Sequence, residues 1–285
     1  MRIRLDIAYD GTHFRGWARQ TSLRTVQGTL EDALALVLGA GPRHGDAPRL
    51  VVAGRTDAGV HAEGQVAHLD LDEQLVEALG RSRPKYGTPF DLLAQRVRGV
   101  LGTYPDVTVR GLREAPEGFD ARFSAVWRRY AYRIADTTTG YDPLERMRTT
   151  NVNARLDVEA MDAAARSLIG LHDFSAYCRP REGATTIRTL LEFDWRRDEQ
   201  GILIANVRAD AFCHSMVRAL VGACIAVGRG RLDVADVARL RDAGERTSAF
   251  PVLAARGLTL MEVGYPSDDQ LAARAERTRA RRDDE

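Results

Sequence analysis

Cysteine is scarce in this sequence, and histidine is scattered, which together exclude a class of site. Only three of the 285 residues are cysteine, Cys178, Cys213 and Cys224, an odd number without the C-x-x-C spacing of many zinc sites. The six histidines include no H-x-x-x-H pair. We therefore expect no structural zinc site and no metal catalysis. The cysteines suit a reducing compartment.

Long apolar stretches are also missing. No run of 18 or more apolar residues occurs, which excludes a transmembrane helix. The first residues, 1–6, alternate polar and apolar side chains and lack the apolar centre of a signal peptide. We expect a strand there and a cytoplasmic protein.

Lysine is almost absent, and neither sign of charge dominates. The sequence has 41 basic and 40 acidic residues, a net charge of +1. All of the basic residues except Lys85 are arginine, which compositional bias alone explains. Because the planar guanidinium grips phosphate at two points, this bias does not hinder RNA binding. The positions of the arginines therefore matter more than their number.

The hydrophobic pattern mixes strands and helices without a regular βαβ alternation. We predict strands at 2–10, 50–53, 65–71, 106–113, 127–135, 185–197, 201–209 and 258–263, and helices at 25–39, 88–101, 157–169, 215–228 and 233–243. The pattern indicates an α+β protein of two similar lobes, 1–115 and 116–266. Each lobe would be a mainly antiparallel sheet covered by helices on one face, with an active-site cleft between them. The polar tail, 267–285, is expected to be disordered.

The densest chemical signal is residues 54–61, Gly-Arg-Thr-Asp-Ala-Gly-Val-His, directly after a short buried strand. The two glycines allow a sharp turn and a close approach by a ligand. Arg55 and Asp57, two residues apart, can present both charged groups to one pocket. The alternative is an ordinary turn with a surface ion pair.

Three further clusters have both a functional and a structural interpretation. The loop at 13–20 can grip splayed RNA through arginine and aromatic side chains, or it can be a solvated loop anchored by two core aromatics. In the strand at 127–135, Tyr130 and Tyr132 share one face, either in a site or in the core. Arg218 lies on an otherwise apolar helix, where a buried guanidinium requires an acidic partner.

Together these clusters resemble the tRNA pseudouridine synthase A family, in the same order and across residues 3–265. The matching segments are Tyr9-Asp10-Gly11, Phe14, Gly16-Trp17, 54–61, Gly64-Gln65-Val66, 121–124, Arg129-Tyr130, Tyr132, 172–174, Met216-Val217-Arg218, Val221-Gly222 and Gly257-Leu258. The segment around Asp57 is the most specific of them.

The resemblance implies an enzyme that isomerises uridine to pseudouridine at tRNA positions 38, 39 and 40, in the anticodon stem-loop. Because this reaction oxidises nothing and carries no group away, the resemblance also implies that no organic cofactor is needed. By the same match Asp57 is the nucleophile, attacking either the uracil ring or C1′, and Arg218 keeps it ionised. Tyr130 would stack on the target base and assist removal of the proton from C5. Arg55 would fill the space left by the flipped base or hold a phosphate.

The resemblance also implies a homodimer that binds tRNA. The candidate RNA-binding residues are Tyr130, Arg15, Trp17, Arg19, Arg122, Arg129 and His61, with Arg128, Arg179, Arg181 and Arg188 as further phosphate contacts. Other classes fit less well. A non-catalytic RNA-binding module does not explain Asp57 together with Arg218. An aspartic protease needs a second Asp-containing triplet, and a phosphotransfer site needs neighbouring carboxylates.

Overall fold

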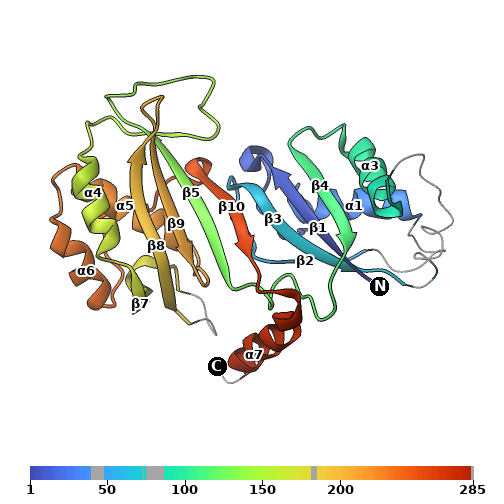
Figure 1. Ribbon diagram of the computed structural model, residues 1–285. Coiled ribbons are helices and arrows are strands. Elements are labelled where there is room, and N and C mark those ends of the chain that lie inside the picture. Colours follow the sequence, from blue (N-terminus) through green and yellow to red (C-terminus); the bar gives the residue numbers. More distant parts are fainter. Residues whose placement is uncertain (40–47, 73, 75–86, 181–184, 284–285) are drawn as a thin grey trace. The chain divides into compact units, whose positions relative to one another are not determined.

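The computed structural model describes residues 1–39, 48–72, 74, 87–180 and 185–283. The chain forms two compact units: unit 1 contains residues 1–125 and 263–283, and unit 2 contains residues 126–262. Each unit combines helices with mainly antiparallel strands (Figure 1). The predicted α+β class is confirmed.

Unit 1 is built on a sheet in which β1 pairs antiparallel with both β3 and β4, and β2 pairs with β3. Helix α3 packs against β4 and α1. The elements are β1 (Arg2–Tyr9), α1 (Val26–Leu38), β2 (Val51–Val52), β3 (His61–Asp70), α3 (Pro89–Leu101), β4 (Val107–Glu114) and α7 (Leu271–Asp283), with 3₁₀ turns at Gly11–His13 and Asp268–Gln270.

Helices α1 and α3 each begin next to a capping residue. The Thr25 hydroxyl accepts a hydrogen bond from the Gly28 N–H at 3.2 Å, and Gly39 ends α1 with a left-handed φ of 67°. Thr88 and Asp91 cap α3 reciprocally. Each cap satisfies backbone groups that the first or last turn leaves without a helical partner. These local signals are why both helices were predictable from sequence.

Unit 2 has the strand order β10-β5-β9-β8-β7, and the short β6 pairs parallel with β5. Helix α4 packs against β8 and α5, and α6 packs against α4. The elements are β5 (Trp127–Ala135), β6 (Thr150–Asn151), α4 (Val158–Arg166), β7 (Gly170–Asp173), β8 (Ile187–Arg197), β9 (Leu203–Ala209), α5 (Met216–Gly228), α6 (Val234–Asp242) and β10 (Leu258–Gly264, whose last two residues belong to unit 1), with 3₁₀ turns at Ser175–Tyr177 and Ala255–Gly257.

The sheet of unit 2 buries one face. In the register of β5, β9 and β8, Tyr130 lies beside Val207, and Val207 lies beside Phe193. Directly paired residues share a face, and all three side chains are buried. The next residues, Arg129, Arg208 and Glu192, lie on the opposite face. The predicted separation of tyrosines from arginines on β5 is therefore confirmed.

The boundary between the units lies later in the chain than the predicted residue 115. Residues 116–125 are fastened to the sheet of unit 1, because Arg2 donates to the Phe119 carbonyl at 2.7 Å. The backbone N–H of Ala121 also donates to His68 Nδ1 at 3.0 Å.

The expectation of a disordered tail is wrong for the described residues, which form helix α7. Leu271 and Ala275, one helical turn apart, are buried. Ser124 donates to the Leu271 carbonyl at 3.1 Å, and Arg279 donates to Asp120 at 2.8 Å. Two apolar side chains at the right spacing are enough to dock a helix that is otherwise polar.

Candidate functional site

The loop that carries Asp57 is pressed against the loop after β1, backbone to backbone. Trp17 N–H donates to the Thr56 carbonyl at 3.0 Å, and Gly59 N–H donates to the Phe14 carbonyl at 3.3 Å. A Cβ on Gly11 would lie 2.0 Å from the Val60 oxygen, so no larger residue fits there. The glycine before Trp17 has a φ of 89°. The glycines of the Tyr-Asp-Gly and Gly-Trp motifs thus serve this close approach.

Beneath the same loop lies a buried polar network. The hydroxyls of Tyr9 and Thr56 are 2.7 Å apart. Gln65 Nε2 donates to the Tyr9 hydroxyl at 3.2 Å and to the Gly54 carbonyl at 2.9 Å. Burial raises the pKa of Tyr9 to about 12, although its hydrogen bonds with Thr56 and Gln65 act in the opposite direction. Residues from β1 and β3 therefore hold the segment that leads into Asp57.

The two charged residues of the loop differ in exposure. Asp57 is half-buried, whereas Arg55 is exposed. The side chain of Thr56 between them is buried at 6% exposure. The Asp57 side chain is therefore more enclosed by the protein than the Arg55 side chain, which faces solvent.

The aromatic and arginine loop at 13–20 divides into anchors and exposed charges. Phe14 and Trp17 are 2% and 1% exposed, which favours the interpretation of two core aromatics. Trp17 packs on Tyr9 with ring centroids 6.1 Å apart. Arg15 is exposed, while Arg19 is held by Asp32 at 2.7 Å and by Glu31 at 3.3 Å.

His61, predicted to contact RNA, is a buried residue at the start of β3. Its Nδ1 lies 3.0 Å from the Gly11 N–H donor and 3.0 Å from Asp10 Oδ1. Nδ1 accepts a hydrogen bond from the Gly11 N–H when it carries no proton, and donates to Asp10 when it carries one. The contact with His61, together with hydrogen bonds from Thr12, holds the pKa of Asp10 well below its usual range. His61 therefore stabilises the Tyr-Asp-Gly turn by contacting both Asp10 and Gly11.

In unit 2, Tyr130 is held by an aromatic neighbour. Its ring is 8% exposed and meets the Phe212 ring edge-on, with centroids 5.2 Å apart and planes at 90°. Tyr132, two residues later, is fully buried and its hydroxyl donates to the Ala254 carbonyl at 2.7 Å. The sequence left open whether these tyrosines belong to a site or to the core; Tyr132 belongs to the core.

Arg218 occupies the first turn of α5 and is half-buried. Its Nε donates to the Leu253 carbonyl at 2.6 Å, and the Leu253 N–H donates back to the Arg218 carbonyl at 3.2 Å. A Cβ on Gly222 would lie 1.9 Å from the Pro251 oxygen, so α5 and this segment are in close contact. Asp57 lies in unit 1 and Arg218 in unit 2, and their pairing stays a prediction.

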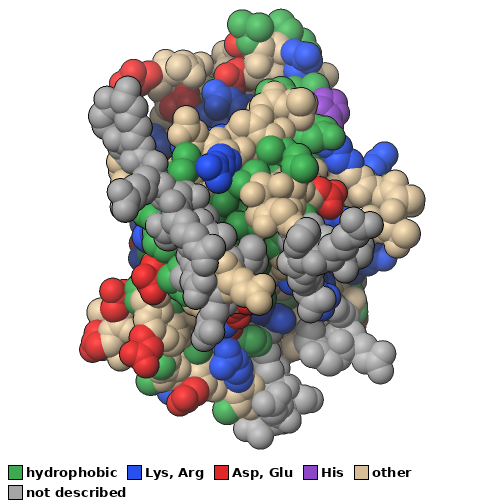
Figure 2. All heavy atoms as spheres, turned by 90° about the vertical axis from the view of Figure 1, so that its right-hand side faces the viewer, with side chains coloured by type: hydrophobic (Ala, Val, Ile, Leu, Met, Phe, Trp, Pro, Cys, Tyr) green, Lys and Arg blue, Asp and Glu red, His purple; other side chains and the backbone are tan. Residues whose placement is uncertain are grey.

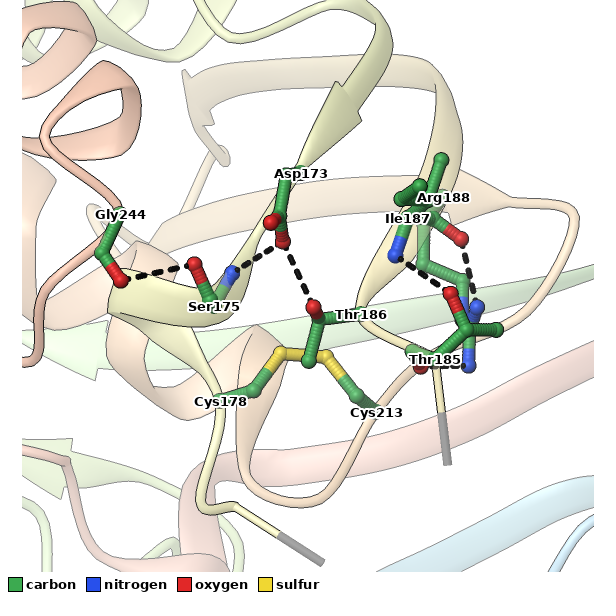
Figure 3. Close-up of a disulfide and its surroundings, with 9 residues drawn as sticks. All are labelled: Asp173, Ser175, Cys178, Thr185, Thr186, Ile187, Arg188, Cys213 and Gly244. Atoms are coloured by element: carbon green, nitrogen blue, oxygen red, sulfur yellow. Dashed lines mark hydrogen bonds between the residues drawn. A yellow bond between two sulfur atoms is a disulfide. The ribbon is translucent and has the colours of Figure 1, made fainter. Parts of the chain in front are cut away.

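The structure joins Cys178 and Cys213 in a disulfide, which corrects the expectation of reduced cysteines (Figure 3). Their Cα atoms are 5.7 Å apart, within the usual range for a disulfide. Cys213 follows Phe212 directly, and the Arg179 N–H donates to the His214 carbonyl at 2.9 Å. The segment that contains Phe212, the ring neighbour of Tyr130, is thus joined by a disulfide and a backbone hydrogen bond to the chain that follows β7. Cys224 is a buried free thiol.

The remaining predicted RNA contacts are spread over both units. Arg122 is exposed with its guanidinium 5.1 Å from the centre of the Phe123 ring. Arg129 pairs with Glu262 at 3.1 Å. Arg128 donates to the Asp210 carbonyl at 2.9 Å, and Arg188 donates to the Thr185 carbonyl at 2.6 Å. Arg179 is exposed, and Arg181 lies outside the described residues.

Two features of the described part of the chain bear on its class. Among these residues no group of three or more His, Cys, Asp or Glu side chains is placed to hold a metal ion. No helix within the described ranges has both the length and the apolar character needed to cross a membrane. On the face seen in Figure 2, arginines (blue) are interspersed with acidic side chains (red).

Sequence reasoning missed the network of Tyr9, Thr56 and Gln65. Its signal was a polar side chain at a strand position whose neighbours are apolar, Gln65 before Val66 and Ala67. Such a residue is buried only where hydrogen-bond partners exist. The partner of Gln65 is 56 residues away in the sequence, so the pairing itself could not be identified from the chain.

Comparison with known proteins places this chain in a family. A family model described as tRNA pseudouridine synthase matches residues 164–266. The chain is 60% identical to tRNA pseudouridine synthase A of Leifsonia xyli subsp. xyli, over 99% of this chain and 97% of that protein. It is 54% identical to the protein of that name from Frankia casuarinae, over 98% of this chain and 95% of that protein. It is 44% identical to the protein of that name from Bifidobacterium longum, over 98% of this chain and 98% of that protein. Similarity of this extent, with the Asp57 loop held between two glycine-containing turns, shows that the chain belongs to the tRNA pseudouridine synthase A family.

Proposed function

We propose that this chain isomerises uridine to pseudouridine in the anticodon stem-loop of tRNA, at positions 38, 39 and 40, with Asp57 as the nucleophile. The observation that carries the proposal is the Asp57 loop, a half-buried carboxylate on a backbone fixed by hydrogen bonds from a neighbouring loop. A nucleophile held in one geometry lowers the entropic part of the barrier. Full-length similarity to tRNA pseudouridine synthase A supports the choice of substrate.

The reaction breaks the N1–C1′ bond, rotates the uracil and forms a C5–C1′ bond; C5 loses its proton and N1 takes one up. Nothing is oxidised or carried away, so a carboxylate and a proton acceptor are sufficient. Asp57 must be ionised to attack, although a closed pocket would raise the pKa of a carboxyl group. A cation beside it in the complex with RNA is therefore required.

Arg218 is the proposed cation. Its Nε donates to the Leu253 carbonyl, which fixes the direction of the guanidinium. A planar guanidinium can bind a carboxylate at two points. We expect Arg218→Ala to lower kcat by at least about 10³-fold, because an uncompensated carboxylate in a dry site protonates rather than attacks. Arg218→Lys should recover only part of kcat, because an ammonium lacks the fork. Near-normal kcat in Arg218→Ala would contradict this role.

Tyr130 is proposed to stack on the target base and to assist removal of the C5 proton. Its ring is fixed by Phe212, so stacking requires little further loss of side-chain freedom. Flipping a base out of a stem costs a few kcal/mol, which stacking and phosphate contacts must offset. The exposed Arg15, Arg55 and Arg122 are proposed to contact phosphates. For Arg55 the alternative role is to fill the space that the flipped base leaves in the stem.

Several predicted RNA contacts fit this proposal in other ways. Trp17 and His61 are buried and act by anchoring the two loops. Arg19 and Arg129 are paired with carboxylates, so they would bind phosphate only by exchanging partners. The enzyme is proposed to act as a cytoplasmic homodimer that binds tRNA by shape, as suits several target positions.

The test is release of tritium from tRNA labelled at uracil C5. In an assay without a methyl donor, pseudouridine formation is the reaction that replaces that hydrogen with a carbon–carbon bond, so the wild-type protein should release the label from positions 38, 39 and 40. Sequencing of the product should find pseudouridine at those positions. A protein that binds the tRNA but releases no label would be an RNA-binding module, and the proposal would fail.

A further inference from the structure

The hydroxyl of Tyr9 forms a hydrogen bond with the hydroxyl of Thr56, the residue that directly precedes Asp57. Tyr9 belongs to β1 and Thr56 to the loop after β2, so the bond joins segments 47 residues apart. We propose that Tyr9 is a positioning residue, which sets the geometry of Asp57 through its hydrogen bond to Thr56. This inference rests on the proposed role of Asp57 as the nucleophile.

Thr56 is held from two sides. Its backbone carbonyl accepts from the Trp17 N–H at 3.0 Å, and its hydroxyl bonds to Tyr9 at 2.7 Å. With both the backbone and the side chain fixed, the residue has little freedom to rotate. Asp57 follows it directly, so the direction of the carboxylate depends on this pair of contacts.

Gln65 fixes Tyr9 in turn. Both hydrogens of its Nε2 are used, one on the Tyr9 hydroxyl and one on the Gly54 carbonyl, at 3.2 and 2.9 Å. Its Oε1 accepts from the Val66 N–H at 3.2 Å. Because Gln65 donates to the phenolic oxygen, the arrangement that also satisfies the tyrosine proton has Tyr9 donating to Thr56.

The network is dry. Tyr9, Thr56 and Gln65 are 5%, 6% and 0% exposed, so water does not replace a lost partner without a change in the loop. Tyr9 remains a neutral hydroxyl over the working pH range, because burial raises its pKa to about 12. A buried, fully connected set of hydrogen bonds gives direction as well as stability.

The expected effect is on the rate of the chemical step. Tyr9→Phe deletes one oxygen and keeps the ring that packs on Phe14 and Trp17. A nucleophile displaced by a fraction of an ångström loses rate without losing the RNA contacts made elsewhere. We expect kcat to fall about tenfold, with KM for tRNA unchanged.

The experiment measures kcat, KM and thermal unfolding of the full chain for Tyr9→Phe, Thr56→Val, Thr56→Ser and the double variant Tyr9→Phe/Thr56→Val. If one bond carries the effect, the double variant loses no more kcat than either single variant. Thr56→Ser retains the hydroxyl and should keep most of the rate. If Tyr9→Phe does not fold, the comparison of Thr56→Val with Thr56→Ser gives the same answer from the other end of the bond.

Tyr177→Phe is the matched control. Tyr177 is 1% exposed and its hydroxyl donates to the Val237 carbonyl at 2.7 Å, in unit 2. It should lose stability but keep wild-type kcat. A Tyr9→Phe variant that behaves like this control, less stable but with full kcat, would overturn the inference. Pseudouridine formation by Asp57→Asn in the same assay would instead overturn the proposed role of Asp57 as the nucleophile.

Discussion

The two units hold their proposed site residues by different physical means. In unit 1, hydrogen bonds of fixed direction lock the Asp57 loop, from the Trp17 backbone and through Tyr9 and Gln65. In unit 2, Tyr130 is held by an edge-on ring and by burial, and its neighbour is followed by a disulfide. A nucleophile requires direction, whereas a stacking ring requires a surface and a fixed plane. We therefore expect the site residues of unit 1 to be sensitive to the loss of single hydrogen-bonding atoms, and those of unit 2 to changes in the cross-link and in packing.

The largest expected change in stability comes from the disulfide of unit 2. Closing a loop with a sequence separation of 35 residues stabilises the folded state by about 3–4 kcal/mol through the unfolded chain. Reduction with a dithiol should lower the free energy of unfolding by this amount. The double variant Cys178→Ser/Cys213→Ser should be equally unstable and insensitive to the reductant. Three titratable thiols in the denatured, unreduced protein would contradict the cross-link.

Tyr130 tests whether unit 2 supplies a surface alone or also a proton acceptor. Tyr130→Phe keeps the ring and should bind tRNA normally, with kcat lowered about 10²-fold, the usual contribution of a general base. Tyr130→Leu should weaken binding as well, because it removes the stacking face. The measurements are kcat and the tRNA dissociation constant. Full activity in Tyr130→Phe would restrict Tyr130 to stacking, and full activity in Tyr130→Leu would remove both roles.

Gly11 tests the close approach of the two loops in unit 1. Gly11→Ala places a Cβ 2.0 Å from the Val60 oxygen, so the backbone must move, at a loss of about 2 kcal/mol. The displaced loop should also lower kcat. Gly99→Ala is the control, because nothing lies within 4 Å of its Cβ and it is inside α3. It should be stabilising by up to about 1 kcal/mol, since alanine favours a helix. Equal unfolding temperatures for the two variants would show that the loops are not in close contact.

The smallest effect concerns acid and the buried Asp136 of unit 2. Burial works against its charge, but hydrogen bonds from Arg197 and from the backbone N–H groups of Leu156 and Thr139 outweigh it and hold its pKa at about 2. The pKa is lower than the unfolded value of 3.8, so this stabilisation is complete above about pH 4 and is lost as the pH falls through about 2.

We expect a loss of about 1–2 kcal/mol over that interval in urea unfolding experiments. Asp136→Asn should be less stable at neutral pH and should lack this component of the acid dependence. An unchanged acid profile in Asp136→Asn would assign the effect to other carboxylates.

Local signals made much of the fold predictable. The caps Thr25 and Gly39 fixed α1 to within a residue, and strict alternation fixed β5. Helix α7 was not predicted because its sequence is mostly polar. Burial of Leu271 and Ala275 against the rest of unit 1 stabilises it, and the sequence does not show that contact. The disulfide was missed because its cysteines are separated by 35 residues.

The sequence motifs named candidate site residues, whose roles in catalysis and RNA binding stay predictions, but they did not show which of these residues anchor loops. The glycines and Asp57 were recognisable in the motif, yet burial separates Trp17 and His61, which anchor loops, from Arg15 and Arg55, which are exposed. The network of Tyr9, Thr56 and Gln65 arises from strand pairing, which places residues distant in sequence next to one another. Only the three-dimensional arrangement assigns these roles.

The most direct test of the central claim is single-turnover formation of pseudouridine by Asp57→Asn, with the tRNA dissociation constant measured on the same preparation. Asparagine preserves the shape of the side chain and removes only its nucleophilic charge. The account predicts no pseudouridine at positions 38, 39 or 40 and tRNA binding within about threefold of wild type, because affinity comes mainly from arginine–phosphate contacts. Pseudouridine formed by purified Asp57→Asn at a measurable rate would contradict it.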